Sequence, residues 1–119
     1  MKNSLKSSIF FALILMSSSL MAQIKNPKTE TAKVYGNCGM CKKTIEKAIN
    51  EKDVVSAEWN KQTKVLSFTY DAKKTNRKKI LKKVAEAGYD NEMYIAPTSA
   101  YDNLHSCCQY ERPNSKAKK

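Results

Sequence analysis

Two cysteines separated by two residues, Cys38 and Cys41, lie in the stretch VYGNCGMCKKTIEK at residues 34–47. A strand-like run gives way to a helical pattern at this point, so both thiols fall at the start of a helix. Unpaired backbone N–H groups and the positive end of the helix dipole favour thiolates there. A thiolate is both a nucleophile and a metal ligand, so the pair suits metal capture, redox chemistry or a structural disulfide.

The three uses of this pair differ in what else they require. Copper(I) accepts few, soft ligands, so two sulfurs suffice, whereas a structural zinc site normally takes four ligands. A redox C-x-x-C is expected beside a βαβ unit in a thioredoxin-like chain, and the element order here is different. A disulfide between such close residues closes a small loop and gains little entropy. The residues favour metal binding, with redox catalysis and a disulfide as the alternatives.

A second group of ligand types lies near the carboxyl end, in LHSCCQYER, where His105, Cys107 and Cys108 are close in sequence. Adjacent cysteines are hard to join to each other, whereas one imidazole and two thiols are ligands that copper(I) and zinc accept. We expect this tail to form a second soft-metal site or to fold back and complete the first one. The alternatives are a disordered tail whose thiols have no function, or tail cysteines that link the tail to the domain through disulfide bonds.

The first half of the domain is predicted from short periodic runs. Residues 29–36 are β-leaning and follow Pro27, which suits a strand. The next segment is an amphipathic helix, since its apolar residues share one face and its charged residues fall largely on the other. That apolar face contains Cys41, Ile45, Ala48 and Ile49.

The next segment is predicted to be a β-hairpin. VVSAEW and KVLSFTY flank the turn NKQT and alternate apolar with polar residues, which predicts a hairpin with Leu66, Phe68 and Tyr70 on one face.

A second helix and a last strand complete the pattern. Thr75 or Asn76 can cap the helix and Gly88 ends it. Its inward stripe consists of Ile80, Leu81, Val84, Ala85 and Ala87. MYIAP, at residues 93–97, reads as a short strand that Pro97 ends. The order βαββαβ predicts an α+β domain in which two helices cover one face of a four-stranded antiparallel sheet.

The amino-terminal stretch has the layout of a secretory signal peptide. Lys2 and Lys6 precede an apolar run from Ile9 to Met16, and small and polar residues follow as far as Ala22. The run is too short to cross a bilayer core of roughly 30 Å as a helix.

We therefore divide the chain into a signal peptide (1–22), a linker (23–28), one small domain (29–97) and a basic tail (98–119). The mature chain is expected to be soluble, monomeric and exported across the cytoplasmic membrane, into a periplasm.

The chain is strongly basic, with a formal net charge of +11 over 119 residues. Loss of the two leader lysines would leave +9 on the mature chain. Such a charge commonly indicates nucleic acid. Export argues against that partner, and the chain has no recognition-helix or stacking-aromatic pattern, so we expect no nucleic-acid binding. The charge is interpreted as a solvated surface that steers an acidic partner.

Three runs, GNCGMCKKTIEKAI, KVLSFTYD and RKKILKKVAEAGYD, resemble the heavy-metal-associated domain. That family includes copper chaperones, the amino-terminal modules of metal-pumping ATPases and the periplasmic mercuric-ion scavenger. The resemblance covers residues 29–97 and implies a ferredoxin-like βαββαβ sandwich. It implies that Cys38 and Cys41 are the metal ligands. Gly88 and Tyr89 match the family's Gly-Tyr after its second helix, which packs near the metal loop.

The loop departs from the family pattern. Where the family usually has Gly-Met-Thr before the first cysteine, residues 35–37 are Tyr-Gly-Asn, and Met40 lies between the cysteines instead. Met40 is either a third soft ligand or an exposed loop residue. Tyr89 either shields the metal and sets its approach or belongs to the core. Trp59 is expected to pack in the core and is given no functional role.

These observations predict a small exported metal-binding protein and not an enzyme. It is expected to capture a thiophilic ion, copper(I) in the first place, with mercury(II) or zinc as alternatives. It would pass the ion by sulfur-for-sulfur exchange to or from a metal donor or acceptor, such as a metal-transporting ATPase or an efflux component. Two other classes remain open: an extracytoplasmic thiol-disulfide oxidoreductase that uses the same C-x-x-C, and a basic adaptor whose metal domain is structural.

The leader generates the first testable prediction. In its native host the mature protein should begin at or near Gln23, because the charged start, apolar run and small-residue end are the features that signal peptidase recognises. Intact-mass measurement of the purified protein checks this. A mass that still includes Met1 to Ala22 would show that the segment is an uncleaved anchor.

Overall fold

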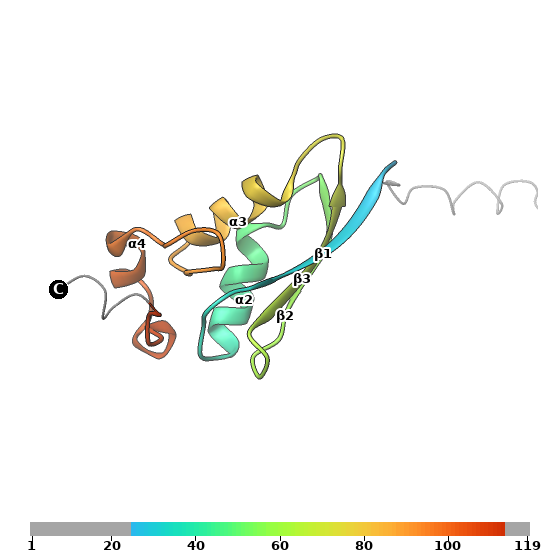
Figure 1. The fold of residues 1–119 in the computed structure, drawn as a ribbon. Coiled ribbons are helices and arrows are strands. Elements are labelled where there is room, and N and C mark those ends of the chain that lie inside the picture. The colour runs from blue at the N-terminus through green and yellow to red at the C-terminus, as the bar shows by residue number, and fades with distance from the viewer. Residues whose placement is uncertain (1–24, 114–119) are drawn as a thin grey trace, which may run out of the picture.

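The computed structural model describes residues 25–113, and Figure 1 shows their fold. The predicted signal peptide and the lysines that close the chain lie outside the described residues. The elements, in chain order, are β1 (Pro27–Lys33), α2 (Gly39–Ala48), β2 (Val54–Trp59), β3 (Val65–Asp71), α3 (Arg77–Glu86), α4 (Thr98–Asp102) and the 3₁₀ helix η1 (Ser106–Cys108). The order of the first five confirms the prediction. Within residues 25–113, no helix is long and apolar enough to span a bilayer.

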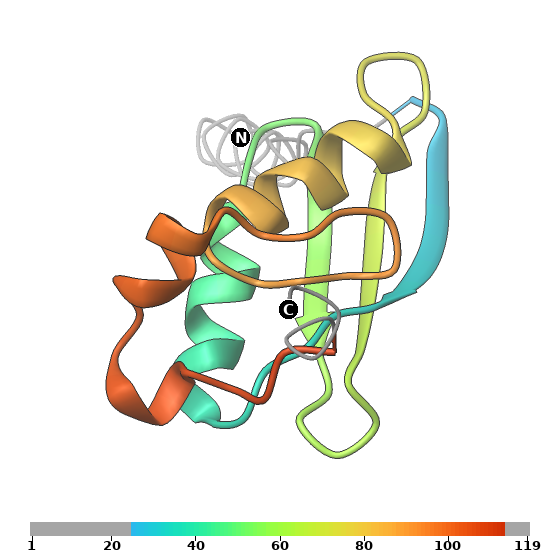
Figure 2. The same cartoon turned by 60° about the vertical axis from the view of Figure 1, so that its left-hand side comes forward.

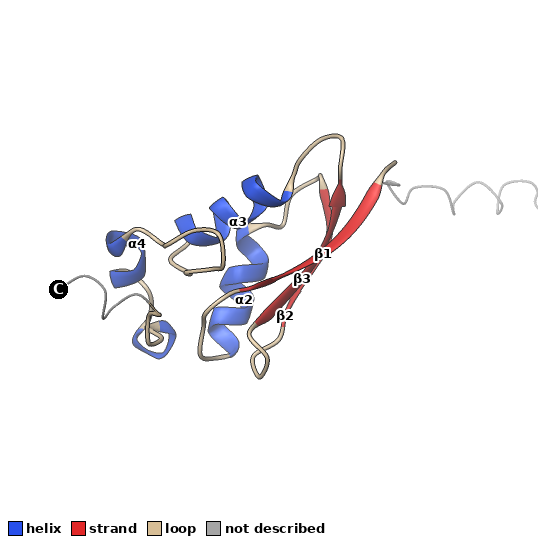
Figure 3. Cartoon of the chain, in the orientation of Figure 1, coloured by secondary structure: helices blue, strands red, loops and turns tan. Residues whose placement is uncertain are grey.

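The three strands form an antiparallel sheet in the order β1-β3-β2, so the last strand of the hairpin is the central one. Helices α2 and α3 lie on one side of this sheet (Figure 3). The face predicted from the alternation in β3 is the buried one, since Leu66, Phe68 and Tyr70 are at most 3% exposed. Burial of such side chains against the helices is the main contribution to the stability of the fold.

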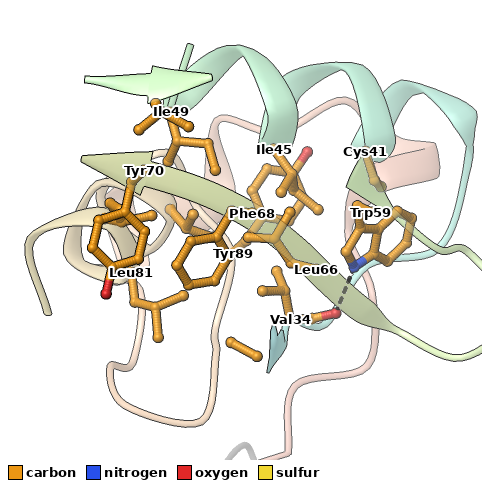
Figure 4. Close-up of a cluster of buried hydrophobic side chains, with 14 of the residues drawn as sticks. Val34, Cys41, Ile45, Ile49, Trp59, Leu66, Phe68, Tyr70, Leu81 and Tyr89 are labelled. Carbon is orange, nitrogen blue, oxygen red and sulfur yellow. Dashed lines mark hydrogen bonds between the residues drawn. The ribbon is translucent and has the colours of Figure 1, made fainter. Parts of the chain in front are cut away.

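The core continues from this face toward the cysteine loop. Figure 4 shows Cys41 and Ile45 of α2 above the same cluster that contains Phe68 and Tyr89. Trp59, at the end of β2, closes the cluster on the side of Cys41, and its indole N–H donates a hydrogen bond of 2.9 Å to the carbonyl oxygen of Val34. The cysteine loop is therefore built on the edge of the hydrophobic core.

The boundaries of α3 agree with the predicted signals. Asn76 is the N-cap, and its side-chain oxygen accepts a hydrogen bond of 3.0 Å from the backbone N–H of Lys79. Gly88, with φ at 111°, follows the helix in a conformation that other residues rarely adopt. A Cβ at this position would also lie 3.0 Å from the carbonyl oxygen of Ala100. Glycine is thus required both by the turn and by the close approach of the tail.

The fourth strand predicted at residues 93–97 is wrong: the described residues form a three-stranded sheet. Only an isolated bridge between Val34 and Asn91 remains of that pairing. The physical reason is that side chains satisfy the backbone locally. The Asn91 side-chain oxygen accepts from the backbone N–H groups of Met93 and Tyr94, at 3.1 and 3.0 Å, and the Asp90 carboxylate accepts from that of Ala96 at 2.7 Å. The segment is therefore a side-chain-capped loop (Figure 3).

The tail folds back onto the domain through α4 and η1, which is one of the arrangements expected for it. Figure 2 shows η1 beside the first turn of α2, and the two elements are in contact. Cys108 and Tyr110 are each 2% exposed. The Tyr110 hydroxyl donates to the carbonyl oxygen of Gly88 at 2.9 Å and accepts from the backbone N–H of Asp90 at 2.7 Å. The tail thereby becomes part of the core.

A buried ion pair fixes the end of this segment. Arg112 donates to both carboxylate oxygens of Asp90, at 2.7 and 2.8 Å, and to the carbonyl oxygen of Ala96 at 2.6 Å. The Asp90 side chain is 2% exposed and that of Arg112 is 13% exposed. Burial alone would raise the pKa of Asp90, but the Arg112 guanidinium and the Ala96 N–H hold it below its usual value.

This ion pair gives the second prediction. Arg112→Met should lower the free energy of unfolding by about 3–5 kcal/mol, because it leaves the Asp90 carboxylate buried without its counter-ion. The contribution is fully present above the ordinary carboxylate pKa of about 3.9 and is lost as pH falls through the lower pKa of the folded state. Urea unfolding followed by circular dichroism, at neutral and at acidic pH, measures both effects.

Arg77→Met is the matched control. Arg77 also pairs with a carboxylate, that of Glu92, but the two side chains are 28% and 44% exposed. Such a surface pair is worth at most about 1 kcal/mol. Equal losses for the two variants would mean that the Asp90 pair is no more important than a surface one.

Candidate metal centre

The cysteine pair is held by the start of α2. Cys38 is the N-cap of this helix and Cys41 lies in its first turn. Their sulfur atoms are 3.3 Å apart. The backbone N–H of Asn37 donates a hydrogen bond of 3.4 Å to the Cys41 sulfur, which orients it toward Cys38. The structure therefore brings the two predicted ligands together in the arrangement that the spacing predicted.

The loop before the helix rests on Trp59. A Cβ at Gly36 would lie 3.0 Å from the indole ring and 3.2 Å from the Cβ of Cys41, so a larger residue there would press on both. The Lys64 ammonium donates to the Gly36 carbonyl oxygen at 2.6 Å and lies 5.4 Å from the centre of the indole ring. Trp59 thus supports the loop, a role beyond the core packing expected for it from the sequence.

Cys108 joins the pair from the tail. Its sulfur is 3.4 Å from that of Cys38, and the sulfurs of Cys38, Cys41 and Cys108 all lie within 4.8 Å of one another. Cys41 and Cys108 are buried, whereas Cys38 is half-buried. Three thiols from two distant parts of the chain therefore form one compact group, which we call the inner thiols.

Cys107 lies at the outer side of this group. Its sulfur is 3.4 Å from that of Cys38, 3.9 Å from that of Cys108 and 3.6 Å from the thioether of Met40. Cys107 is exposed, and Met40 is 43% exposed. Cys107 contacts Cys38 without belonging to the set of mutually close inner thiols. Met40 and Cys107, the outer sulfurs, thus lie between solvent and the inner thiols.

His105 is not brought into the cluster. It is exposed and is the N-cap of η1, where its carbonyl oxygen accepts a hydrogen bond of 2.7 Å from the backbone N–H of Cys108. Within residues 25–113, the group of ligand atoms close enough to share an ion contains cysteines only. His105 therefore shapes the turn that carries Cys108 rather than contributing its imidazole.

The cluster favours a thiolate at Cys38. Burial alone would raise the pKa of this thiol, but the backbone N–H of Cys41 and the thiols of Cys41, Cys108 and Cys107 lower it to about 6. Burial raises the pKa of Cys108, and the hydrogen bond to Cys38 raises that of Cys107. These shifts favour the thiolate form at Cys38 over that at Cys107 and Cys108.

Tyr89 lies on the inner side of the cluster. It is fully buried and stacks on Tyr110, with ring centroids 5.9 Å apart. Its hydroxyl has no hydrogen-bond partner among the described residues. Burial raises the pKa of this hydroxyl, and the neighbouring side chains of Cys108 and Cys41 raise it further. Tyr89 is therefore both a core residue and the polar neighbour of two inner thiols.

Comparisons with known proteins agree with this architecture. The sequence profile of the heavy-metal-associated domain matches residues 37–90, which include Cys38 and Cys41 but end before the tail. The structure of the CopZ metallochaperone is 32% identical, with a TM-score of 0.52, and the match covers 54% of this chain and 98% of that one. No curated protein sequence matches the chain significantly.

Two further solved structures match with similar coverage. Oxidized MerP from Ralstonia metallidurans CH34 is 32% identical, with a TM-score of 0.52, over 56% of this chain and 94% of that one. A copper form of a CopA variant from Bacillus subtilis is 26% identical, with a TM-score of 0.50, over 60% of this chain and 100% of that one. These matches support the predicted ferredoxin-like architecture, although the sheet described here has three strands.

The lowered pKa of Cys38 gives the third prediction. In the reduced, metal-free protein at pH 7, iodoacetamide should modify Cys38 before Cys107, although Cys107 is more exposed, because the thiolate is the reacting species. The rate at Cys38 should rise as pH passes through about 6. Peptide mapping by mass spectrometry after short exposures measures the order of reaction.

Cys41→Ala is the control, since it removes the side-chain hydrogen bond to Cys38 and should slow alkylation of Cys38 at pH 7. Faster modification of Cys107 than of Cys38 throughout the range from pH 5 to 8 would contradict the charge distribution described above.

Proposed function

Because this chain belongs to the heavy-metal-associated domain family, we propose that it captures a soft metal ion at Cys38 and Cys41 and passes it to another protein. The observation that carries the proposal is the pair of sulfurs 3.3 Å apart at the start of α2, one of them half-buried and favoured as a thiolate at neutral pH. Thiolates bind soft ions strongly, and a half-buried one can be reached by a ligand from outside.

Copper(I) is the proposed ion. Sulfur donors select copper(I) over harder cations, and they satisfy it at low coordination number. One structural neighbour is described as a metallochaperone and another as a copper form of CopA, which favours the same choice. Mercury(II) and zinc are the competing ions. Zinc normally takes four ligands, so the Cys38 and Cys41 pair alone suits it less well.

Transfer is proposed to occur by ligand exchange. A thiolate of the partner protein forms a bond to the ion, after which one bond between the ion and a cysteine of this chain breaks. The ion stays copper(I), and the released cysteine takes a proton from solvent or keeps its charge. The basic surface would steer an acidic acceptor, such as the metal-binding module of a transporting ATPase. We further propose export to the periplasm and a monomeric carrier.

A thiol-disulfide oxidoreductase is the second candidate, and the low pKa of Cys38 beside Cys41 is the observation that favours it. In that reaction the Cys38 thiolate would attack a substrate disulfide, which releases one substrate thiolate and leaves a mixed disulfide. Cys41 would then attack the Cys38 sulfur, which forms a Cys38–Cys41 disulfide and releases the second substrate thiolate. Catalysed reduction of a disulfide-linked peptide by the reduced protein with glutathione as reductant would support this candidate. Metal transfer without such turnover would support the carrier.

The fourth prediction tests the carrier. Cys38→Ser and Cys41→Ser should each remove most of the copper(I) affinity, because one thiolate leaves the ion without its second strong donor. Competition against a chromophoric copper(I) chelator under anaerobic, reducing conditions measures the affinity. Since protons compete for the same sulfurs, the affinity should also fall as pH is lowered.

Thr63→Ala is a suitable control, since this residue is exposed in the β2–β3 turn, has no sulfur and leaves the cluster intact. Unchanged copper(I) affinity in the double variant Cys38→Ser/Cys41→Ser would refute the assignment of the pair. Circular dichroism should show that the variants keep their fold, because the helices and sheet form the core without metal.

A further inference from the structure

The two cysteines of the tail are adjacent in sequence but lie in different environments. Cys108 is 2% exposed and belongs to the inner thiols, whereas Cys107 is exposed and contacts the thioether of Met40. Both sulfurs are 3.4 Å from that of Cys38. The family profile ends at residue 90, so the family match assigns neither of them a function.

We propose that these two cysteines divide one metal site between them. Cys108 is a third ligand that joins Cys38 and Cys41 in a buried trigonal site, and Cys107 is the exposed thiol through which a soft ion enters and leaves it. The proposal rests on the proposed metal binding by Cys38 and Cys41 and adds the coordination number and the route of exchange.

The inner thiols fit a three-coordinate ion. At a metal–sulfur distance of about 2.3 Å, three sulfurs in a plane around one ion lie about 4 Å apart. The three inner sulfurs all lie within 4.8 Å of one another, and Cys38 is 3.3 and 3.4 Å from the other two. Movement of a fraction of an ångström would therefore accommodate the ion. Copper(I) and mercury(II) accept such a sulfur set, whereas zinc would lack a fourth inner ligand.

The buried hydroxyl of Tyr89 is a second, independent observation. It lies near the side chains of Cys108, Cys41 and Thr44, but it is closed off from solvent and makes no hydrogen bond of normal geometry to any described residue. A buried donor without a partner is costly. A metal-bound thiolate at Cys108 would be an acceptor for it, and outer donors of this kind commonly orient metal ligands.

The outer sulfurs form the route to solvent. Cys107 and Met40 are both exposed and 3.6 Å apart, and the Cys107 sulfur is in contact with Cys38, the only half-buried inner thiol. When the ion arrives, the Cys107 thiol gives its proton to solvent and its sulfur forms a bond to the ion, while a bond between the ion and one ligand of the donor breaks. The sulfurs of Cys38, Cys41 and Cys108 then form bonds to the ion, and any of these thiols that carries a proton gives it to solvent. The bonds from the ion to Cys107 and to the donor's remaining ligand break, and Cys107 takes a proton from solvent. The ion remains copper(I) throughout.

The alternative of a separate second site in the tail is disfavoured by the geometry. Such a site would need ligands of its own, and His105, the third donor type in this segment, is exposed and outside the cluster. Cys107 and Cys108 both contact Cys38, so an ion bound to the tail cysteines would share that sulfur with the inner site. The structure thus favours completion of the first site.

X-ray absorption spectroscopy of the full chain loaded with copper(I) alone tests the coordination number. The wild-type protein and Cys107→Ser should each show three sulfur neighbours, and Cys108→Ser should show two. The wild-type measurement needs no variant, so it decides the point even if Cys108→Ser fails to fold. Two sulfur neighbours in the wild-type protein would overturn the third ligand, and four would overturn the separation of Cys107 from the site.

Affinity and exchange rate test the division of roles. Cys108→Ser should lower the copper(I) affinity by more than the roughly 10–100-fold that loss of an outer partner costs. Cys107→Ser should keep the affinity but slow the release of copper(I) to a chromophoric chelator several-fold. Ser106→Ala, an adjacent exposed change without sulfur, should alter neither quantity. A large loss of affinity in Cys107→Ser, or an unchanged release rate, would overturn its assignment as the exchange thiol.

These outcomes are separate from those that test the proposed function. If copper(I) is bound by two sulfurs and Cys108→Ser keeps the affinity, the inference fails while metal binding by Cys38 and Cys41 stands. If the double variant Cys38→Ser/Cys41→Ser keeps its copper(I), the proposed function itself fails, and the inference fails with it.

Discussion

The buried carboxylate of Asp90 is the constraint on which the arrangement of the site depends. A charge removed from water has to be paired, and its partner, Arg112, comes from the part of the tail that follows η1. The same carboxylate accepts from the Ala96 N–H, so it also shapes the loop that leads to α4. Because this pair anchors the chain on both sides of η1, Cys108 has little freedom to leave the cysteine loop.

Within this frame Cys38 is the centre of the sulfur cluster. Its sulfur contacts those of Cys41, Cys107 and Cys108, at 3.3, 3.4 and 3.4 Å. Cys41 and Cys108 are buried, Cys38 is half-buried and Cys107 is exposed, so the four thiols differ in how easily solvent reaches them. A closed four-ligand site would hold an ion firmly, whereas a carrier needs a site whose coordination can open. In the proposed carrier, the different exposure of the buried and exposed thiols would allow both firm binding and exchange.

The sequence allowed the hairpin, both long helices and the cysteine pair to be predicted, because each has a local signal. Asn76 caps α3, and the alternation in β3 marks its buried face. The fourth strand was predicted wrongly, since its apolar residues carry no information about the side-chain caps at Asp90 and Asn91. Those caps satisfy the backbone groups that a strand would have used.

The tail could not be predicted for a different reason. A five-residue helix and a single 3₁₀ turn are too short to show a period. The contact between Cys38 and Cys108 spans 70 residues and depends on an ion pair whose partners are 22 residues apart. The cysteine spacing indicated that the tail could complete the first site, but the separate environments of Cys107 and Cys108, and the exclusion of His105, follow only from tertiary packing.

The position of Trp59 makes its fluorescence useful for following the cysteine loop. It is the only tryptophan in the chain, and its ring packs against the backbone of the cysteine loop, next to the Cβ of Cys41. The indole is 1% exposed and hydrogen-bonded, so its surroundings change only when the protein around it changes. Its fluorescence is therefore a native optical reporter placed directly behind the cluster, sensitive both to movement of the loop and to quenching by a heavy atom bound there.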